Sequence, residues 1–335
     1  MNAKKLPSGS YRARATTQVN GQRVYKSFTA DTKEQAEFLA ATWATKKRRS
    51  VKNPTVSEAI DNYISHREPV WSPPTTKSYL SMARIIKRDI GRVCVSDMTS
   101  EKVQAYLSSL KCSPKTVRNY KTFLIPVLNS VNPDIKYNVV LPQKIPTEYH
   151  IPDEESVKHL IENASGDLKV AILLGAVGSL RRGEICALKQ EDILRDLHAV
   201  YVHADMVIDK NRKWVYKPTP KTSSSIRKVD LPKEIIDLIP DKPGFIIGKD
   251  PDWITRTFGR YARRMGLQCR FHDLRHYCAS YLHSIGVPDA YIQERGGWHT
   301  DQTLKNVYRH TLTDKVNVFA KKSNKAFAES FKGVI

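Results

Sequence analysis

The sequence predicts a multidomain α+β protein built from three parts. The chain has 335 residues, which is enough for two or three domains. Residues 8–30 alternate polar and apolar side chains as strands do, whereas residues 53–140 repeat apolar side chains at helical spacing. We therefore expect a small basic β-sheet-plus-helix N-terminal domain, an all-helical domain, and a mainly α domain that contains a small antiparallel sheet.

The composition favours a nucleic-acid partner. There are 55 Lys and Arg against 34 Asp and Glu, which gives a net charge of +21. Such a surplus is typical of proteins that bind a polyanion, either nucleic acid or an anionic membrane surface. No stretch approaches the roughly 18–20 apolar residues of a membrane span, and the N-terminal residues lack the apolar stretch of a signal peptide. We therefore expect no membrane partner.

The cysteines indicate a reducing compartment. There are 5 of them, an odd number, and no two have the CxxC spacing: Cys94, Cys112, Cys186, Cys269 and Cys278. This pattern argues against a disulfide framework and against a zinc ribbon. We expect a cytoplasmic protein.

Residues 1–50 predict a compact and very basic domain. Residues 11–15 alternate as a strand does, and Asn20-Gly21 is a strong signal for a hairpin turn. A helix is expected from about Asp31 to Lys47. Residues 1–52 contain twelve Lys and Arg against three Asp and Glu. A solvated surface is the plainer interpretation, but a polyanion partner explains this bias better.

Residues 53–140 predict four short helices. Thr55 and Glu58 have the spacing of a capping box. Thr99 is an expected helix cap, and Ser113 precedes a proline that suits the first helical position. The helices carry Lys and Arg on their outer faces, so they fit either a DNA clamp or an ordinary bundle.

Residues 141–152 contain three prolines and predict a linker. A helix with acidic residues in its first turn follows, as the helix dipole favours. Val170–Val177 is expected to be a buried helix. Strands are expected at Ala199–Ile208, Trp214–Lys217 and Ile226–Leu231, with helices from there to the end.

Three stretches of this last part place cations where they suit a phosphodiester. His272 and Arg275 are three residues apart and share a helix face. Arg181 lies where a new helix is expected to begin, and free backbone N–H groups favour anions there. Glu184 follows one turn later and is placed to orient a cation. Lys221 lies in a turn between two expected strands. A surface pair or a solvated side chain is the plainer interpretation of each.

The order of these residues is more specific than any one of them. LRRGE contains Arg181, Lys221 follows it, and HDLRH contains His272 and Arg275. The stretch GGWHTDQTLKNVYRH then places Tyr308 nine positions after His299. Together these motifs resemble the tyrosine recombinase (phage/conjugative-transposon-type integrase) family. The resemblance implies a catalytic set of Arg181, Lys221, His272, Arg275, His299 and Tyr308.

The resemblance implies a site-specific DNA recombinase, or integrase, that cuts and rejoins DNA without ATP to integrate or excise a mobile element. Tyr308 is the implied nucleophile and forms a covalent 3′-phosphotyrosyl intermediate. Arg181 and Arg275 would stabilise charge on the phosphate, and His299 would bond to it. His272 would take part in proton transfer at the tyrosine. Lys221 would protonate the leaving oxygen, and Glu184 would support the site. No metal ion or other cofactor is implied.

The resemblance extends over the whole chain. It implies an arm-type DNA-binding domain at 1–50, a helical core DNA-binding domain at 53–140 and a catalytic domain at 150–335. The implied partners are double-stranded DNA attachment sites of arm type and core type, accessory excision or bending proteins, and three further copies of the chain in a homotetramer on DNA. The implied location is the bacterial host cytoplasm, on DNA. The candidate DNA-binding residues are Arg12, Arg14, Arg23, Lys26, Lys77, Lys115 and Arg118.

The sequence departs from the family pattern in three places. Ser179 stands where many members have glycine, and Gly-Gly-Trp-His replaces the commoner Leu-Gly-His. The stretch from Arg181 to Lys221 is longer than in compact members, so Lys217 and Lys228 compete with Lys221 for its role. The C-terminal segment is expected to pack on a neighbouring subunit or on its own; its apolar residues are Val316, Val318, Phe319, Ala326, Phe327 and Phe331.

Three other readings of the sequence remain. A type IB topoisomerase uses similar chemistry without strand exchange, and the basic N-terminal domain argues against it. A non-catalytic DNA-binding protein would use the same charge but needs no set of six residues, and it would show only salt-dependent binding. A metal site formed by His272, His276 and Cys278 has little support, because the cysteines lack ligand spacing.

Overall fold

The computed structural model describes residues 2–19, 22–49, 53–145, 150–219, 225–298, 324–325 and 328–329. The fold is mixed α/β, mostly helical, with small antiparallel sheets. The chain divides into two compact units, and the main division falls after Ile145, inside the expected linker. No helix among these residues combines the length and the apolar character that crossing a membrane requires.

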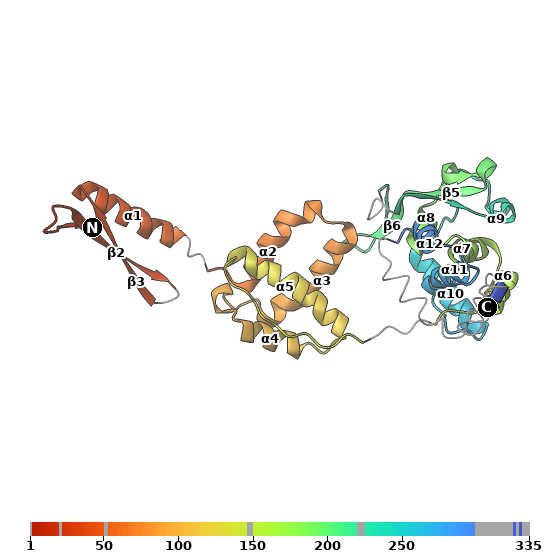
Figure 1. Cartoon of the computed structure of the whole chain (residues 1–335), viewed down its shortest axis with the longest axis horizontal. Coiled ribbons are helices and arrows are strands. Elements are labelled where there is room, and N and C mark those ends of the chain that lie inside the picture. Colours follow the sequence, from red (N-terminus) through yellow and green to blue (C-terminus); the bar gives the residue numbers. More distant parts are fainter. Residues whose placement is uncertain are drawn as a thin grey trace. The chain divides into compact units, whose positions relative to one another are not determined.

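The N-terminal residues form a sheet covered by one helix. Strands β1 (Lys4–Lys5), β2 (Tyr11–Val19) and β3 (Gln22–Ala30) pair antiparallel in the order β1-β2-β3. Helix α1 (Lys33–Arg49) lies across one face of the β2–β3 hairpin (Figure 1). Small side chains let the layers meet closely, because Ala13 and Ala15 are buried against α1. The expected hairpin is confirmed, since Val19 lies opposite Gln22.

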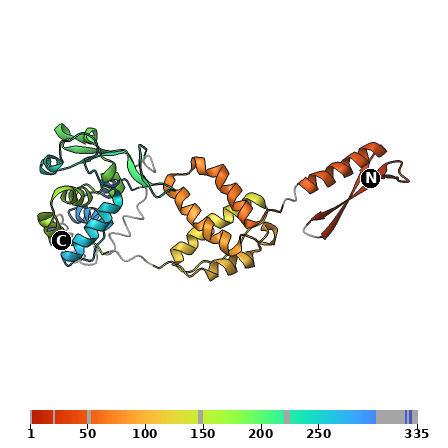
Figure 2. The same ribbon diagram turned by 180° about the vertical axis from the view of Figure 1, so that it is seen from behind.

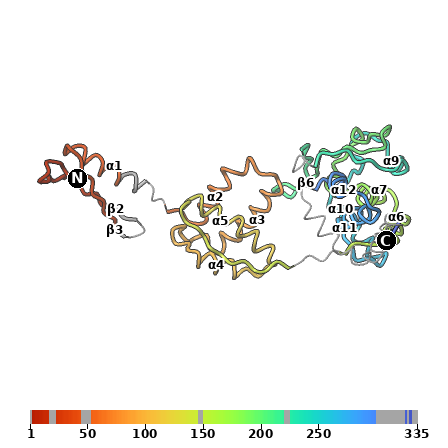
Figure 3. Tube along the Cα trace, viewed as in Figure 1, coloured from red at the N-terminus to blue at the C-terminus, as the bar shows by residue number. Residues whose placement is uncertain are grey.

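Residues 53–145 form a helical bundle with its own core. The helices are α2 (Val56–Arg67), α3 (Pro73–Ile90), α4 (Ser100–Ser109) and α5 (Pro114–Val131), joined by the 3-10 turns η1 (Glu68–Val70) and η2 (Val95–Asp97). Their caps are those that the sequence predicts. Thr55 and Glu58 form a reciprocal capping box, and Thr99 and Ser113 accept hydrogen bonds from the third residue after each. Figure 3 traces this bundle along its Cα path.

The second unit is built around two central helices. Its helices are α6 (Glu154–Asn163), α7 (Gly166–Ala176), α8 (Arg182–Ala187), α9 (Lys233–Leu238), α10 (Pro251–Arg264), α11 (Phe271–Ser284) and α12 (Asp289–Gly296). Helices α7 and α11 lie side by side (Figures 1 and 2). A Cβ atom at Gly175 would lie 3.2 Å from the Phe271 ring, so glycine lets the two helices approach. The two helices therefore pack closely where α7 ends and α11 begins.

The strands of this unit differ from the prediction in one respect. Ala199–Ile208 is two strands, β5 (Ala199–Val202) and β6 (Asp205–Ile208), which belong to different sheets. Strand β5 lies between β4 (Ile193–Leu194) and β8 (Arg227–Asp230), whereas β6 pairs with β7 (Trp214–Lys217). The chain leaves the first sheet at His203, whose Nε2 lies 2.8 Å from Asp192 Oδ1 in the 3-10 turn η3 (Gln190–Asp192). The contact between His203 and Asp192 lies at the break between β5 and β6, where alternation alone predicted one continuous strand. A second turn, η4 (Arg195–Leu197), leads from β4 into β5.

Candidate active site

Arg181 is held at the start of a helix by the turn that precedes it. Ser179 has a φ of 58°, in the left-handed region that favours glycine. Glycine adopts this conformation most readily, and in this chain serine does so. Arg181 is the N-cap of α8, as the sequence predicts, and its backbone N–H donates to Glu184 Oε2 at 2.9 Å. About a third of its side chain is exposed, so the guanidinium can reach a ligand.

Glu184 joins Arg181 to a buried arginine that the sequence analysis missed. Its Oε1 accepts from Arg181 Nη1 at 2.5 Å. Its two oxygens also accept from Arg227 at 3.0 and 3.3 Å, so a single carboxylate serves two guanidinium groups. Arg227 and Glu184 each expose only 3% of their side chains. Burial would raise the pKa of Glu184, but the charges of Arg227 and Arg181 outweigh it and lower the pKa to about 2.

A sequence signal for Arg227 exists, although it is visible only once the strand is known. In β8, Arg227 and Val229 are buried while Lys228 and Asp230 are exposed. An arginine on the inward face of a strand needs a buried carboxylate. LRRGE supplies that carboxylate, because Glu184 is buried in α8.

Replacing Glu184 by glutamine is expected to destabilise the second unit strongly. The variant leaves the buried Arg227 cation without its carboxylate, and breaking a buried pair in this way costs about 3–5 kcal/mol. Hydrogen exchange of the α7 amides measures this loss. The matched control is Glu191→Gln, because Glu191 forms an exposed pair with Lys189 and such pairs contribute about 0–1 kcal/mol. Equal protection in the two variants would contradict the prediction.

The contribution of Glu184 to folding stability depends on pH with a definite sign. The folded pKa of Glu184, about 2, lies below its ordinary value of 4.5. Its contribution is therefore complete above about pH 4.5 and is lost as the pH falls toward 2.

Helix α11 supplies His272 and Arg275. Arg275 is 1% exposed and donates to the backbone oxygens of Ser179 and Gly296. His272 lies at the exposed beginning of the helix, and its ring centroid is 5.0 Å from that of His276. Desolvation by surrounding protein atoms, followed by the charges of Arg275 and Arg181, lowers the pKa of His272 to about 4. The nearby positive charges therefore favour the neutral imidazole, which can accept a proton.

The C-terminal end of α12 is bound by three arginines. The carbonyls of the last residues of a helix lack partners within it. Here the oxygens of Arg295, Gly296 and Gly297 accept from Arg227, Arg275 and Arg181 respectively. The three arginines come from β8, α11 and the start of α8. The end of α12 therefore holds together side chains that are far apart in the sequence.

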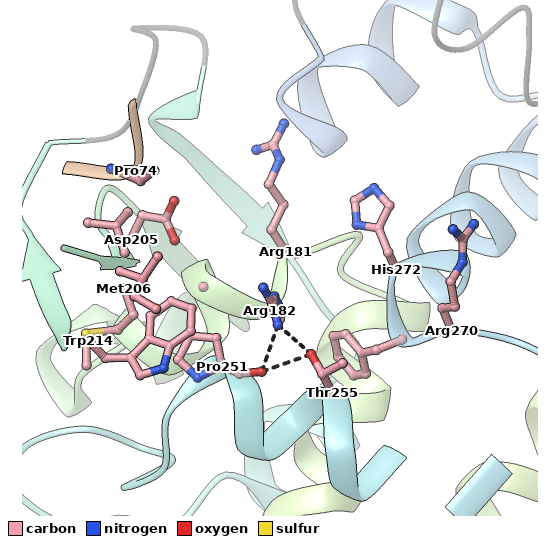
Figure 4. A pocket seen from close by; sticks show the side chains of 14 residues that line it. Pro74, Arg181, Arg182, Asp205, Met206, Trp214, Pro251, Thr255, Arg270 and His272 are labelled. Atoms are coloured by element: carbon pink, nitrogen blue, oxygen red, sulfur yellow. Dashed lines mark hydrogen bonds between the residues drawn. The ribbon is translucent and has the colours of Figure 1, made fainter. Parts of the chain in front are cut away.

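A cavity of about 590 Å³ opens beside Arg181 and His272. Figure 4 shows these two side chains extending to the same side, whereas Arg182 turns toward α10 and donates to Thr255 Oγ1 at 2.6 Å. The other wall is mostly apolar and includes Met206, Trp214 and Phe271. Asp205 also lines the cavity; burial, followed by the negative charge of Glu184, raises its pKa to about 6. The cavity thus combines donors for an anion with an apolar wall.

The structure describes four of the seven residues predicted for the active site: Arg181, Glu184, His272 and Arg275. It brings them together, because Arg181 bonds to Glu184, and Arg181 and Arg275 donate to the neighbouring oxygens of Gly297 and Gly296. His272 lines the same cavity as Arg181. The positions of Lys221, His299 and Tyr308 lie outside the described residues, as do the apolar C-terminal residues from Val316 to Phe331. Lys217 and Lys228 are in β7 and β8. Among the described residues, no cluster of three or more His, Cys, Asp or Glu has an arrangement that could hold a metal ion.

The candidate DNA-binding residues separate into two groups. Arg12, Arg14 and Arg23 lie on the sheet face away from α1, because they alternate with the positions that pair with or neighbour buried Ala13 and Ala15. Lys26 lies opposite Ala15 and so is on the α1 side, where its Nζ is 5.5 Å from the Phe28 ring centroid. Lys115 is exposed, and Lys77 is half-buried. Arg118 is half-buried and donates to the Pro142 oxygen, which leaves it less available for DNA.

Comparison with known proteins points to one family. The profile of the phage integrase family matches residues 152–315. A "Tyrosine recombinase XerC-like" protein of Caldanaerobacter subterraneus subsp. tengcongensis is 25% identical over 88% of this chain and 90% of its own length. The ICEBs1 integrase of Bacillus subtilis is 25% identical over 96% of this chain and 99% of its own.

Solved structures show a similar fold. The Tn1549 transposon integrase, in complex with transposon right end DNA, has a TM-score of 0.65 at 19% identity and covers 80% of this chain and 99% of its own. A lambda integrase dimer bound to a COC′ core site has a TM-score of 0.58 at 16% identity and covers 92% of this chain and 94% of its own. The motifs, the family match and the full-length relatives agree. Residues 152–315 belong to the phage integrase family, and the chain is a tyrosine site-specific recombinase.

Proposed function

We propose that this recombinase integrates or excises a mobile element by joining DNA transiently to Tyr308. One observation carries the assignment of the site. Arg181 and His272 line one cavity, and the buried Arg275, from another helix, lies close enough for its charge to lower the pKa of His272. Two guanidinium groups suit the two non-bridging oxygens of a phosphodiester. Preorganised cations of this kind stabilise the charge that develops in the transition state.

The roles of the side chains follow from their chemistry. The Tyr308 hydroxyl oxygen attacks phosphorus, a bond between phosphorus and that oxygen forms, and the P–O5′ bond breaks. The phosphate stays on the 3′-oxygen, which gives a 3′-phosphotyrosyl ester, and the 5′-oxygen leaves. His272 accepts the tyrosine proton, because the nearby positive charges favour its neutral form. Lys221 donates a proton to the departing 5′-oxygen, and His299 hydrogen-bonds a phosphate oxygen. The new ester conserves the energy of the broken one, so a second 5′-hydroxyl can reverse the reaction without ATP.

We assign DNA contacts to all three parts of the chain. Residues 1–50 would bind arm-type sites through the sheet face that carries Arg12, Arg14 and Arg23. Residues 53–140 would bind core-type sites beside the catalytic domain at 150–335. The DNA-bound neighbours named above, and a lambda integrase tetramer bound to a Holliday junction, support assembly on DNA. We propose the C-terminal segment as the link between four copies in a bacterial host.

A covalent-trapping assay tests the proposal. Protein incubated with fragmented host and element DNA is stopped with SDS, and the attached DNA is sequenced. Adducts at a few related sequences, with the DNA linked through its 3′ end to the peptide that contains Tyr308, are expected. Salt-sensitive binding without any adduct would instead indicate a non-catalytic DNA-binding protein. Relaxation of supercoiled DNA without recombinant products would indicate a topoisomerase.

A further inference from the structure

The indole of Trp298 lies against Arg275. The guanidinium carbon is 4.2 Å from the centroid of the Trp298 ring. This is well inside the distance of about 6 Å at which a cation is attracted to an aromatic face. Trp298 also follows the carbonyls of Gly296 and Gly297, which accept from Arg275 and Arg181. The ring therefore sits where the phosphate-binding arginines meet α12.

The two glycines before Trp298 make this contact possible. A Cβ atom at Gly296 would lie 2.3 Å from two ring atoms of Trp298, so any side chain there displaces the indole. Gly297 has a φ of 60°, which favours glycine, and it turns the chain back over the end of α12. The Trp298 backbone N–H then donates to the Gln293 oxygen at 3.0 Å. Gly-Gly-Trp, which departs from the commoner Leu-Gly pattern, is thus one structural unit.

Arg275 needs such a neighbour because its charge is buried without a counterion in contact. Within the described part of the chain it forms no ion pair with a carboxylate, and its Nε has no hydrogen-bond partner. Hydrogen bonds to two backbone oxygens and the face of one indole ring offset the cost of burying the Arg275 charge. Burial, followed by the charge of Arg181, lowers the pKa of Arg275. An aromatic face stabilises a desolvated cation more than a saturated side chain of the same size does.

We propose that Trp298 is a positioning residue for DNA cleavage, holding the Arg275 guanidinium in a fixed and dehydrated orientation toward the scissile phosphate. This inference rests on the proposed function, because it assigns Arg275 to the phosphate. It names Trp298 as a residue that acts through Arg275 and does not itself contact the reacting atoms. The π face, rather than the volume of the side chain, is the property that matters.

A graded series tests the idea. The single-turnover cleavage rate at saturating DNA is expected to be similar for Trp298→Phe and the unaltered protein, within about threefold, and to fall about tenfold or more for Trp298→Leu. The dissociation constant for DNA is expected to stay within about twofold in both. Gly296→Ala retains the indole but displaces it, so its rate is expected to fall like that of Trp298→Leu. Trp253→Leu is the matched control, because Trp253 lies on α10 and packs against the hydrophobic core of the second unit.

A second readout does not depend on activity. The Nε–H resonance of Arg275, observed by NMR without DNA, is expected to lose its ring-current shift in Trp298→Leu and to retain most of it in Trp298→Phe. Equal cleavage rates in the unaltered protein and Trp298→Leu would overturn the inference. So would equal losses in Trp298→Phe and Trp298→Leu, which indicate a packing role only. Failure of the unaltered protein to form any adduct would instead overturn the proposed function, while the NMR result would still report on the contact.

Discussion

Tyr308→Phe is expected to bind DNA as tightly as the unaltered protein and to form no covalent product. The substitution removes one oxygen atom, which is the atom that joins DNA in the proposed reaction. The ring and its volume remain, so contacts with DNA and neighbouring residues change little. No other group of the site replaces a nucleophile, and the expected loss is therefore complete within the detection limit of an SDS gel.

Two controls make this result decisive. Tyr291→Phe removes the same oxygen from a half-exposed tyrosine on α12 whose hydroxyl contacts Arg295, and it is expected to leave adduct formation intact. A DNA-binding measurement on Tyr308→Phe separates loss of chemistry from loss of folding. Adducts that persist in Tyr308→Phe would show that another residue is the nucleophile.

Arg275→Lys is expected to slow the cleavage step about 10²–10³-fold, which is the usual effect of removing one preorganised donor from a transition-state site. Lysine keeps the charge but loses the planar fork. In this structure the fork spans the backbone oxygens of Ser179 and Gly296, which come from the turn before α8 and the end of α12. A single ammonium group cannot hold both in the same plane, so the phosphate site becomes less ordered.

The measurement is the single-turnover rate at saturating DNA, with the dissociation constant measured separately. We expect the dissociation constant to change less than tenfold, because the charge is retained and the chain carries 55 Lys and Arg. The matched control is Arg260→Lys on the exposed face of α10, for which a rate within about twofold is expected. Similar rates for Arg275→Lys and Arg260→Lys would remove Arg275 from the proposed mechanism.

Local signals predicted much of the fold. Caps at Thr55, Thr99 and Ser113 each depend on a side chain that bonds to its own next turn, so their positions can be read from a few residues. The break between β5 and β6 was missed because it depends on His203 and Asp192, which are separated by other elements. Alternation of side chains cannot distinguish one long strand from two strands of different sheets.

In the candidate active site, too, local motifs were predicted and contacts between residues far apart in the sequence were missed. The HDLRH and LRRGE motifs identify Arg275 and Arg181 because their spacing is local. Arg227 was missed, since its partner Glu184 lies 43 residues earlier in the sequence. The reason for Gly-Gly-Trp was also hidden, because it depends on a ring that contacts an arginine of another helix. Contacts between residues far apart in the sequence are thus the part of the site that only the three-dimensional structure shows.

The single buried carboxylate shared by Arg181 and Arg227 has a consequence for the protein without DNA. With Arg275 nearby, the charges of three guanidinium groups act on one glutamate, so positive charge is in excess among the described residues of the site. Such an excess opposes folding, and a bound phosphate relieves it. By thermodynamic linkage, whatever binds the folded form alone stabilises it. The attachment site is thus both a substrate and a stabilising ligand. The same excess of positive charge that lowers the stability of the free enzyme favours the binding of DNA.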